Sequence, residues 1–367
     1  MQICICRISV KIKIGDITKI RTGKLDANAA DENGQYPFFT CSKEPLKINT
    51  YSYDCECVLV AGNGDLNVKY YNGKFDAYQR TYIIEDDSDG LLFMPYLYFF
   101  MESYIDELRK QSIGGVIKYI KLKNLTDALI ELPSIEVQRK IVNIISKSKE
   151  IVRRKENEFE LLDELVRARF VEMFGNPVDN PMNWKKKKLK DIVTEDCTIS
   201  YGIVQTGEEQ REGIPVFRPV DIVNHTPKVE ELKKTTEFIS DRYKKTLLKG
   251  HELLITVRAN IADTFIADKE FMGCNVGRGI VPIRTQEDIM RLEFLKCLID
   301  NRHLNDILKS KAKGITLIQL NMEDLRNVEL IIPPIDLQID YLKYSSLIDK
   351  SRLLSNHSLL LLKSIIF

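Results

Sequence analysis

Two segments of this sequence lie 200 positions apart and repeat one pattern without a gap. Residues 114–138 read GGVIKYIKLKNLTDALIELPSIEVQ, and residues 314–338 read GITLIQLNMEDLRNVELIIPPIDLQ. The identical pairs are Gly114/Gly314, Leu125/Leu325, Pro133/Pro333, Ile135/Ile335 and Gln138/Gln338. A repeat of this length restricts the fold, because each copy must form the same kind of structure.

Earlier parts of the two halves correspond more loosely but in the same order. The corresponding pairs are 14–17 with 189–192, 35–38 with 214–217, and 59–63 with 254–258. The separation drifts along the chain, so loops have changed length. The order of the matches indicates an internal duplication and predicts two similar globular domains.

Each predicted domain mixes strand and helix patterns. Short alternating runs such as 58–61 and 253–257 are typical of strands. Residues 95–110 and 291–309 have the apolar spacing of helices. The predicted fold class is α+β.

A long helix follows each globular part. After Pro133, with Ser134 as the expected N-cap, no Pro or Gly occurs until Gly175, so about 40 residues can form a helix of ~60 Å. The apolar seam predicted for it contains Val137, Ile141, Ile144, Ile151, Leu162 and Leu165.

The second helical pattern follows Pro333-Pro334. Leu347, Leu354 and Leu361 are spaced by seven, which is typical of a coiled coil. We therefore expect the two helices to pair as an antiparallel coiled coil in a pseudo-twofold repeat; the alternative is a helix packed on its own domain. The predicted parts are 1–133 and 175–334 as globular domains, and 134–174 and 335–367 as helices.

Composition excludes several classes of protein. Lys and Arg total 54 and Asp and Glu total 53, so a strongly basic, polyanion-coating protein is not expected. The eight cysteines include no CxxC pair, which argues against a zinc site and favours reduced thiols. The apolar start, residues 1–7, alternates like a strand and is too short for a signal peptide. No run reaches the ~18 apolar residues of a membrane span, and we expect a cytoplasmic protein.

Catalytic motifs are absent or weak. The sequence contains no P-loop and no (N/D/S)-P-P-(Y/F) segment of an adenine methyltransferase. Asp221, Glu231 and Lys233 imitate a metal-dependent nuclease string, which we interpret as a solvated loop. His225, His251, His303 and His357 stand in no recognisable nucleophile setting.

The ordered set of segments resembles the specificity subunit of a Type I restriction-modification enzyme. The segments that carry the resemblance are Leu132–Val142, Ala168–Pro177, Ile332–Gln338, Gly250–Arg258, Gly273–Arg278, Val60–Gly64 and Tyr70–Phe75. Together with the spacing between them they cover nearly the whole chain.

The resemblance implies a non-catalytic DNA-binding subunit without its own cofactor. Each globular domain would be a target-recognition domain that reads one half of a split double-stranded DNA target, asymmetric because the halves have diverged. The helices would space the domains and dock DNA adenine methyltransferase subunits, and a restriction or translocase subunit could join. S-adenosylmethionine, ATP and Mg would reside on these partners. The last helix is the shorter one, which bears on the strength of the second methyltransferase dock.

Cations and amide side chains mark the expected DNA contacts, because they bind phosphates and base edges, and in the first half aromatic residues lie among them. In the first half they are Lys69, Tyr70, Tyr71, Asn72, Lys74, Tyr78, Gln79 and Arg80. In the second half they are Arg211, Arg218, Arg258, Asn260, Asn275 and Arg278. Replacing Arg258 or Arg278 with Ala should cost about 1–3 kcal/mol of binding and relax specificity at one base.

Two other functions fit parts of the sequence. A structural adaptor could use the coiled coil for assembly and would need no sequence-selective DNA binding. A nuclease could use the acidic string at Asp221, and the isolated chain would then cleave DNA with a divalent metal.

Overall fold

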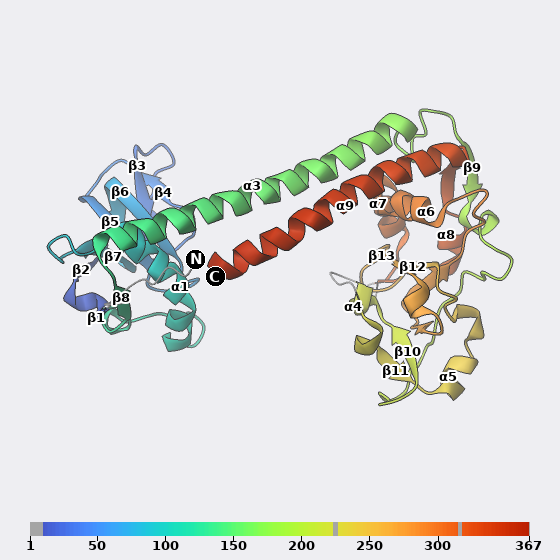
Figure 1. Ribbon diagram of the computed structural model, residues 1–367, viewed down its shortest axis with the longest axis horizontal. Helices are drawn as coiled ribbons and strands as arrows, with labels where there is room; N and C mark the ends of the chain where they lie inside the picture. The colour runs from blue at the N-terminus through green and yellow to red at the C-terminus, as the bar shows by residue number, and fades with distance from the viewer. Residues whose placement is uncertain (1–9, 223–226, 315–317, 367) are drawn as a thin grey trace, which may run out of the picture. The chain divides into compact units, whose positions relative to one another are not determined.

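The computed structural model describes residues 10–222, 227–314 and 318–366, which form two compact units (Figure 1). Unit 1 contains the described residues up to Glu156 and those from His357 onward. Unit 2 contains the described residues from Asn157 to Asn356. The chain is a mixed α/β protein. Within these ranges, no helix combines the length and the apolar character needed to span a membrane. The strand expected at 1–7 lies outside the described residues.

Unit 1 is built on a six-stranded sheet with the order β2-β7-β5-β6-β3-β4. Neighbouring strands are antiparallel except for β3 and β6, which are parallel. Its strands are β2 Thr18–Thr22, β3 Tyr36–Phe39, β4 Leu46–Ile48, β5 Tyr53–Ala61, β6 Val68–Ala77 and β7 Thr81–Asp86.

Short elements complete unit 1. Strand β1 (Val10–Lys13) pairs antiparallel with β8 (Leu129–Leu132). The helices are α1 Met94–Gln111 and α2 Leu122–Thr126, with 3-10 turns η1 Ile14–Asp16 and η2 Ala27–Ala29.

Alternation along β5 gives unit 1 two hydrophobic layers. Val58 and Val60 belong to a cluster with the buried face of α1. Cys57 and Leu59 point the other way and belong to a cluster with Phe75. Since both faces are covered, the centre of β5 is continuously apolar, as expected for a buried strand.

Unit 2 contains two three-stranded sheets, with the orders β11-β10-β14 and β13-β12-β15, and a two-stranded sheet of β9 and β16. The strands are β9 Lys185–Lys188, β10 Ile214–Phe217, β11 Lys233–Thr235, β12 Glu252–Thr256, β13 Thr264–Ala267, β14 Asn275–Val276, β15 Ile280–Ile283 and β16 Glu329–Ile332. The basic run 185–188 is thus an exposed strand paired antiparallel with β16.

Short helices cover the sheets of unit 2. They are α4 Pro219–Ile222, α5 Glu237–Asp241, α6 Leu292–Asp300, α7 Arg302–Lys311 and α8 Met322–Arg326. The 3-10 turns are η3 Leu189–Asp191, η4 Val229–Glu231, η5 Lys244–Thr246 and η6 Lys269–Phe271. The single helix expected at 291–309 is wrong, because the chain breaks at Asn301, whose side chain accepts from the His303 amide and caps α7.

Two long helices, α3 (Ile135–Phe174) and α9 (Ile335–Ile366), contribute to both units. In unit 2, the ring of Phe170 on α3 lies 5.5 Å from that of Tyr341 on α9. Nearer to the N-terminus of α3, Asp163 forms an ion pair with Arg352 on α9. In unit 1, Lys363 Nζ lies 2.8 Å from a carboxylate oxygen of Glu156. The numbering falls on α3 as it rises on α9, so the contacting sections run antiparallel.

Half of the apolar seam predicted for α3 is wrong by one residue. Ile144 is 60% exposed and Ile151 is 46% exposed, as is Leu165 at 49%. Their neighbours Ile145 and Val152 are half-buried instead. The sequence offers isoleucine or valine at both positions of each pair, so spacing alone could not fix the phase.

The seam predicted for α9 has the same error. Leu347 is 65% exposed, whereas Ile348 is only 9% exposed. The side chains of Leu354 and Leu361 lie outside the described part of the chain. The buried stripe of α9 therefore passes through Tyr341 and Ile348.

The repeated glutamines form one buried clamp in each unit. Gln138 accepts a hydrogen bond from the Phe93 amide (2.8 Å) and donates to the carbonyls of Leu91 and Pro133 (both 2.8 Å). Gln338 is equally buried and makes the corresponding three bonds. Its partners are the Arg291 amide at 3.0 Å, the Ile289 carbonyl at 3.0 Å and the Pro333 carbonyl at 2.9 Å.

Candidate nucleic-acid interface

Strand β6 carries the first group of expected DNA contacts and sorts them onto two faces. Tyr71 packs inward, with its ring 5.0 Å from that of Phe39. Asn72 and Lys74 are exposed on the opposite face. Alternation therefore removes Tyr71 from the DNA-contact set, because its ring belongs to a hydrophobic cluster.

Lys69 and Tyr70 are already hydrogen-bonded within unit 1. Lys69 donates to the side-chain oxygen of Asn67, and burial lowers the pKa of its ammonium group. Tyr70 donates its hydroxyl to Glu56 Oε1 at 2.6 Å. Burial and then this carboxylate raise the pKa of Tyr70 to about 12. Contact with DNA would require these two side chains to exchange partners.

The segment after β6 presents two exposed polar side chains. Gln79 and Arg80 are exposed, and Tyr78 is half-buried. The carbonyl of Arg80 accepts from the Gly62 amide at 2.7 Å, which fixes the backbone of this segment against the end of β5.

In unit 2, Arg258 and Arg278 are brought together from different strand ends. Burial first, and then the nearby Arg278, lower the pKa of the Arg258 guanidinium. Arg258 donates from Nε to Gln319 Oε1 at 2.6 Å, and Gln319 in turn donates to the hydroxyl of Tyr201. Arg278 is exposed. The two guanidinium groups are neighbours, and the hydrogen bonds through Gln319 to Tyr201 orient that of Arg258.

The other expected contacts of unit 2 behave differently from one another. Arg211 and Asn260 are exposed. Arg218 forms a two-pronged ion pair with Asp221, through Nη2 to Oδ1 at 2.7 Å and Nε to Oδ2 at 3.1 Å. Its guanidinium is therefore largely engaged within unit 2.

Asn275 cannot contact DNA from its place in the fold. Its side chain is 0% exposed. It donates to Ser240 Oγ at 2.9 Å and accepts from Thr246 Oγ1 at 2.7 Å. The sequence expectation for Asn275 is corrected, because its amide is consumed by the interior of unit 2.

Both acidic residues of the nuclease string have basic neighbours within unit 2. Asp221 is bound by Arg218, and Glu231 lies 4.0 Å from Lys228 Nζ. Among the described residues, no three His, Cys, Asp or Glu side chains are grouped to hold a metal ion. Cys4, Cys6, His225 and the side chain of His357 lie outside the described residues.

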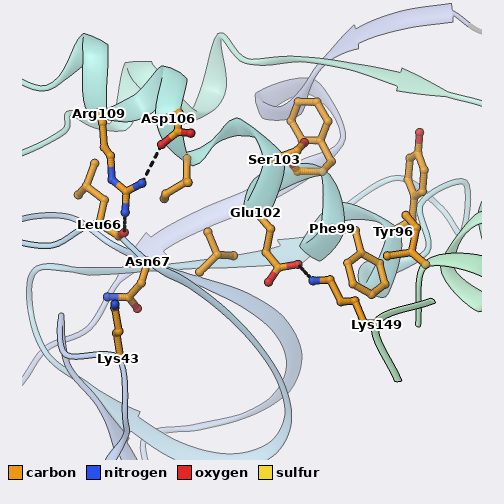
Figure 2. A pocket seen from close by; sticks show the side chains of 14 residues that line it. Lys43, Leu66, Asn67, Tyr96, Phe99, Glu102, Ser103, Asp106, Arg109 and Lys149 are labelled. Atoms are coloured by element: carbon orange, nitrogen blue, oxygen red, sulfur yellow. Dashed lines mark hydrogen bonds and ion pairs between the residues drawn. The ribbon is translucent and has the colours of Figure 1, made fainter. Parts of the chain in front are cut away.

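Unit 1 also has a hollow of ≈ 650 Å³ beside α1, β6 and α3. Figure 2 shows Glu102 and Lys149 pointing toward each other, and Arg109 beside Asp106. Lys149 Nζ lies 2.5 Å from a carboxylate oxygen of Glu102, and Arg109 Nη1 lies 2.7 Å from Asp106 Oδ1. None of the expected DNA contacts lines this hollow. Its charged groups are paired, which distinguishes it from the cation pair of unit 2.

The sequence reasoning missed Asn63, Tyr119, Gln319 and Tyr201. An isolated antiparallel β-bridge joins Asn63 to Tyr119 in unit 1, and the same kind of bridge joins Arg258 to Gln319 in unit 2. The signal was present, since the alignment of 59–63 with 254–258 sets Asn63 against Arg258.

The family model described as "Type I restriction modification DNA specificity domain" matches residues 9–161 and again residues 181–356. The chain belongs to this family. The two matches of the DNA specificity domain together cover most of the sequence, and one falls largely on each unit.

Two curated proteins of Escherichia coli are similar to this family member. The EcoDI specificity subunit of a Type I restriction enzyme is 45% identical over 123 residues, which is 34% of this chain and 27% of that protein. The EcoBI specificity subunit is 22% identical over 307 residues, which is 77% of this chain and 64% of that protein. The chain thus spans less than two thirds of the length of both relatives.

Solved structures share the fold. A crystal structure of the Type I restriction-modification S subunit from M. genitalium has a TM-score of 0.63 at 14% identity, covering 100% of this chain and 96% of that one. A structure from a study of assembly and conformational transition of the Type I system has a TM-score of 0.57 at 17% identity, covering 98% and 95%.

Proposed function

We propose that this chain is the sequence-specificity subunit of a Type I restriction-modification complex and has no catalytic activity of its own. Residues 1–133 and 175–334 act as target-recognition domains, each binding one half of an asymmetric bipartite DNA target. The observation that carries the proposal is the double match of a DNA specificity domain, once over each unit. The exposed cations and amides of both units supply the chemistry that such binding needs.

The long helices space the two domains and dock the partners. Residues 134–174 and 335–367 form an antiparallel coiled coil, and the halves are related by a pseudo-twofold axis. Helix α3 has 40 residues and is therefore ~60 Å long. Two target-recognition domains separated by this length fit two half-sites that have a gap between them. Methyltransferase subunits carry S-adenosylmethionine, and a restriction subunit brings ATP and Mg. The complex acts in the cytoplasm.

The DNA contacts come from the exposed or partly exposed polar side chains of each unit, without Tyr71 and Asn275. The proposed contacts are Lys69, Tyr70, Asn72, Lys74, Tyr78, Gln79, Arg80, Arg211, Arg218, Arg258, Asn260 and Arg278. The exposed members that have no internal ion pair contribute most, because they lose no partner on binding.

A methylation map tests the function. The full chain is co-expressed with the methyltransferase encoded beside it, in a host that lacks adenine methylation, and N6-methyladenine is located by sequencing. The expected result is one split motif of two specific blocks around an unspecified gap. The methyltransferase expressed without this chain is the control, and it should give no such motif.

Two other results would contradict the proposal. If a soluble complex of the two proteins forms but leaves the genome unmethylated, the adaptor interpretation replaces the specificity role. If the isolated chain cleaves DNA with Mg²⁺, the non-catalytic assignment is wrong.

A further inference from the structure

Both units build the same small scaffold around one residue at the end of a central strand. The Gly62 amide donates to the Arg80 carbonyl at 2.7 Å in unit 1, and the Val257 amide donates to the Gly279 carbonyl at 2.8 Å in unit 2. The next residues along the chain are therefore equivalent in position, namely Asn63 and Arg258.

A second pair of backbone bonds confirms this equivalence. The Ile120 amide donates to the Gly62 carbonyl, and the Leu320 amide donates to the Val257 carbonyl, both at 2.9 Å. The residues before these amides, Tyr119 and Gln319, occupy matching places beside Asn63 and Arg258.

The turn that follows also matches. Gly64 has φ +71° and Ala259 has φ +61°. Alanine adopts this left-handed conformation at a cost of about 1 kcal/mol or more, so unit 2 retains the turn despite local strain. The turn fixes the direction in which Asn63 or Arg258 leaves the strand.

One more position completes the set. Tyr78 and Gly277 each form a parallel bridge, to Leu25 and Ile203 respectively. The residue after each is exposed, and these residues are Gln79 and Arg278. We call Asn63 and Gln79 the unit 1 reader positions, and Arg258 and Arg278 the unit 2 reader positions.

The side chains at the reader positions retain donors for a ligand. Among the described residues, Arg258 uses only Nε, and the Nη groups have no hydrogen-bond partner. Arg278, Asn63 and Gln79 form no side-chain hydrogen bond or ion pair with other described residues. Two neighbouring arginines without a carboxylate repel each other, so an acceptor-rich ligand stabilises the arrangement.

We propose that the reader positions contact base edges, and that the two units differ there in the base they select: guanine in the half-site of unit 2, and adenine in that of unit 1. The inference rests on the proposed function. Arginine matches the O6 and N7 acceptors of guanine with two parallel donors, whereas Asn and Gln match the N6 donor and N7 acceptor of adenine. One scaffold thus carries two specificities.

The test compares methylation motifs of single variants in the full complex. Arg258→Gln and Arg278→Gln should each relax or change one guanine in one block, lowering discrimination there roughly 5- to 150-fold. Asn63→Ala and Gln79→Ala should each relax one adenine in the other block. Arg302→Gln, on an exposed residue of α7 far along the chain, is the matched control and should leave the motif unchanged.

Several outcomes separate the inference from the function on which it rests. Absence of any split motif with the native chain would refute the proposed function itself. A native split motif that survives unchanged in all four variants would refute only the reader positions. For a variant that abolishes methylation, the purified complex is bound to duplexes with each base of the motif replaced in turn. An unchanged order of base preferences would then overturn the proposal.

Discussion

Units 1 and 2 share a strand pattern, but only unit 1 keeps one continuous sheet. In unit 1, residues 68–75 of β6 pair with β5, and the end of the same strand pairs with β3. In unit 2 the corresponding stretch is divided into β13 and β14, with the turn Lys269–Phe271 between them. The interruption splits one six-stranded sheet into two three-stranded sheets.

The interruption changes what the interior can hold. The registers of β5 and β12 set Cys57 against Glu252, and both side chains are fully buried. Cys57 packs in a hydrophobic cluster, and burial raises the pKa of its thiol. Glu252 instead accepts from the amides of Lys249 and Gly250, at 2.6 and 2.9 Å, and lies 3.0 Å from Arg284 Nη1. Because β12 begins only at Glu252, the amides of Lys249 and Gly250 lie outside the strand and bind the carboxylate.

The two units share the long helices and the glutamine clamp, while their interiors differ. The glutamine clamps at 138 and 338 are the same in every bond, whereas the sheets differ in continuity and in buried charge. The clamps are therefore kept although the strands differ in length and continuity.

The largest expected effect is on the buried charge of unit 2. Arg284→Ala leaves Glu252 without its cation and should lower the free energy of unfolding by about 3–5 kcal/mol. Arg21→Ala in unit 1 removes an ion pair with Glu85 that is partly open to solvent, and should cost about 1 kcal/mol or less. Urea denaturation of each variant measures both. Equal losses would mean that the difference in burial between the units carries no energetic weight.

The next effect concerns the helix seam. Ile348→Ala should lower the stability of unit 2 by about 2–4 kcal/mol, because it removes buried methyl groups from the face of α9. Its neighbour Leu347, which is exposed, should tolerate Ala within about 0.5 kcal/mol. Thermal unfolding compares the pair. If Leu347→Ala were the costlier change, the seven-residue leucine spacing would define the seam after all.

The two clamps should fail alike. Gln138→Ala and Gln338→Ala each remove the three hydrogen bonds of a buried side-chain amide and leave one backbone amide and two backbone carbonyls without that partner, so each should cost about 1–3 kcal/mol. Hydrogen exchange should accelerate at the Phe93 amide in the first variant and at the Arg291 amide in the second. Gln286→Ala, which loses one bond to the Val193 carbonyl, is the milder control. If hydrogen exchange accelerated in only one of the two variants, the two clamps would not stabilise their units equally.

The smallest effect is chemical and leaves stability unchanged. Burial raises the pKa of Cys274 in unit 2 to about 11, so at pH 8 only about 0.1% of this thiol is the reactive thiolate. We expect Cys274 to resist iodoacetamide in the native protein, and its labelling to rise as pH approaches 11. The half-buried Cys41 of unit 1 should react before it. Mass spectrometry of the labelled peptides checks the order, and early labelling of Cys274 would show that unit 2 opens.

Some features follow from the sequence alone. The uninterrupted stretch after Pro133 determines the length of α3, because no Pro or Gly breaks the backbone hydrogen bonding before Gly175. The repeat around Gln138 and Gln338 determines two copies of one local structure. Short continuous runs of apolar residues determine β5 and β12, since a strand that is covered on both faces is apolar at successive residues.

Tertiary structure alone decided the rest. Isoleucines at both 144 and 145 satisfy the spacing, and only packing chose 145. Asn275 has the chemistry of a base reader, but the partners that bury it come from segments about 30 residues away. Arg258 and Gln319 are 61 residues apart in sequence and meet only in the folded unit. The spacing of residues along the sequence indicates a local preference for helix or strand. Which side chains are buried, and which partners they bind, depends on contacts that form only in the folded chain.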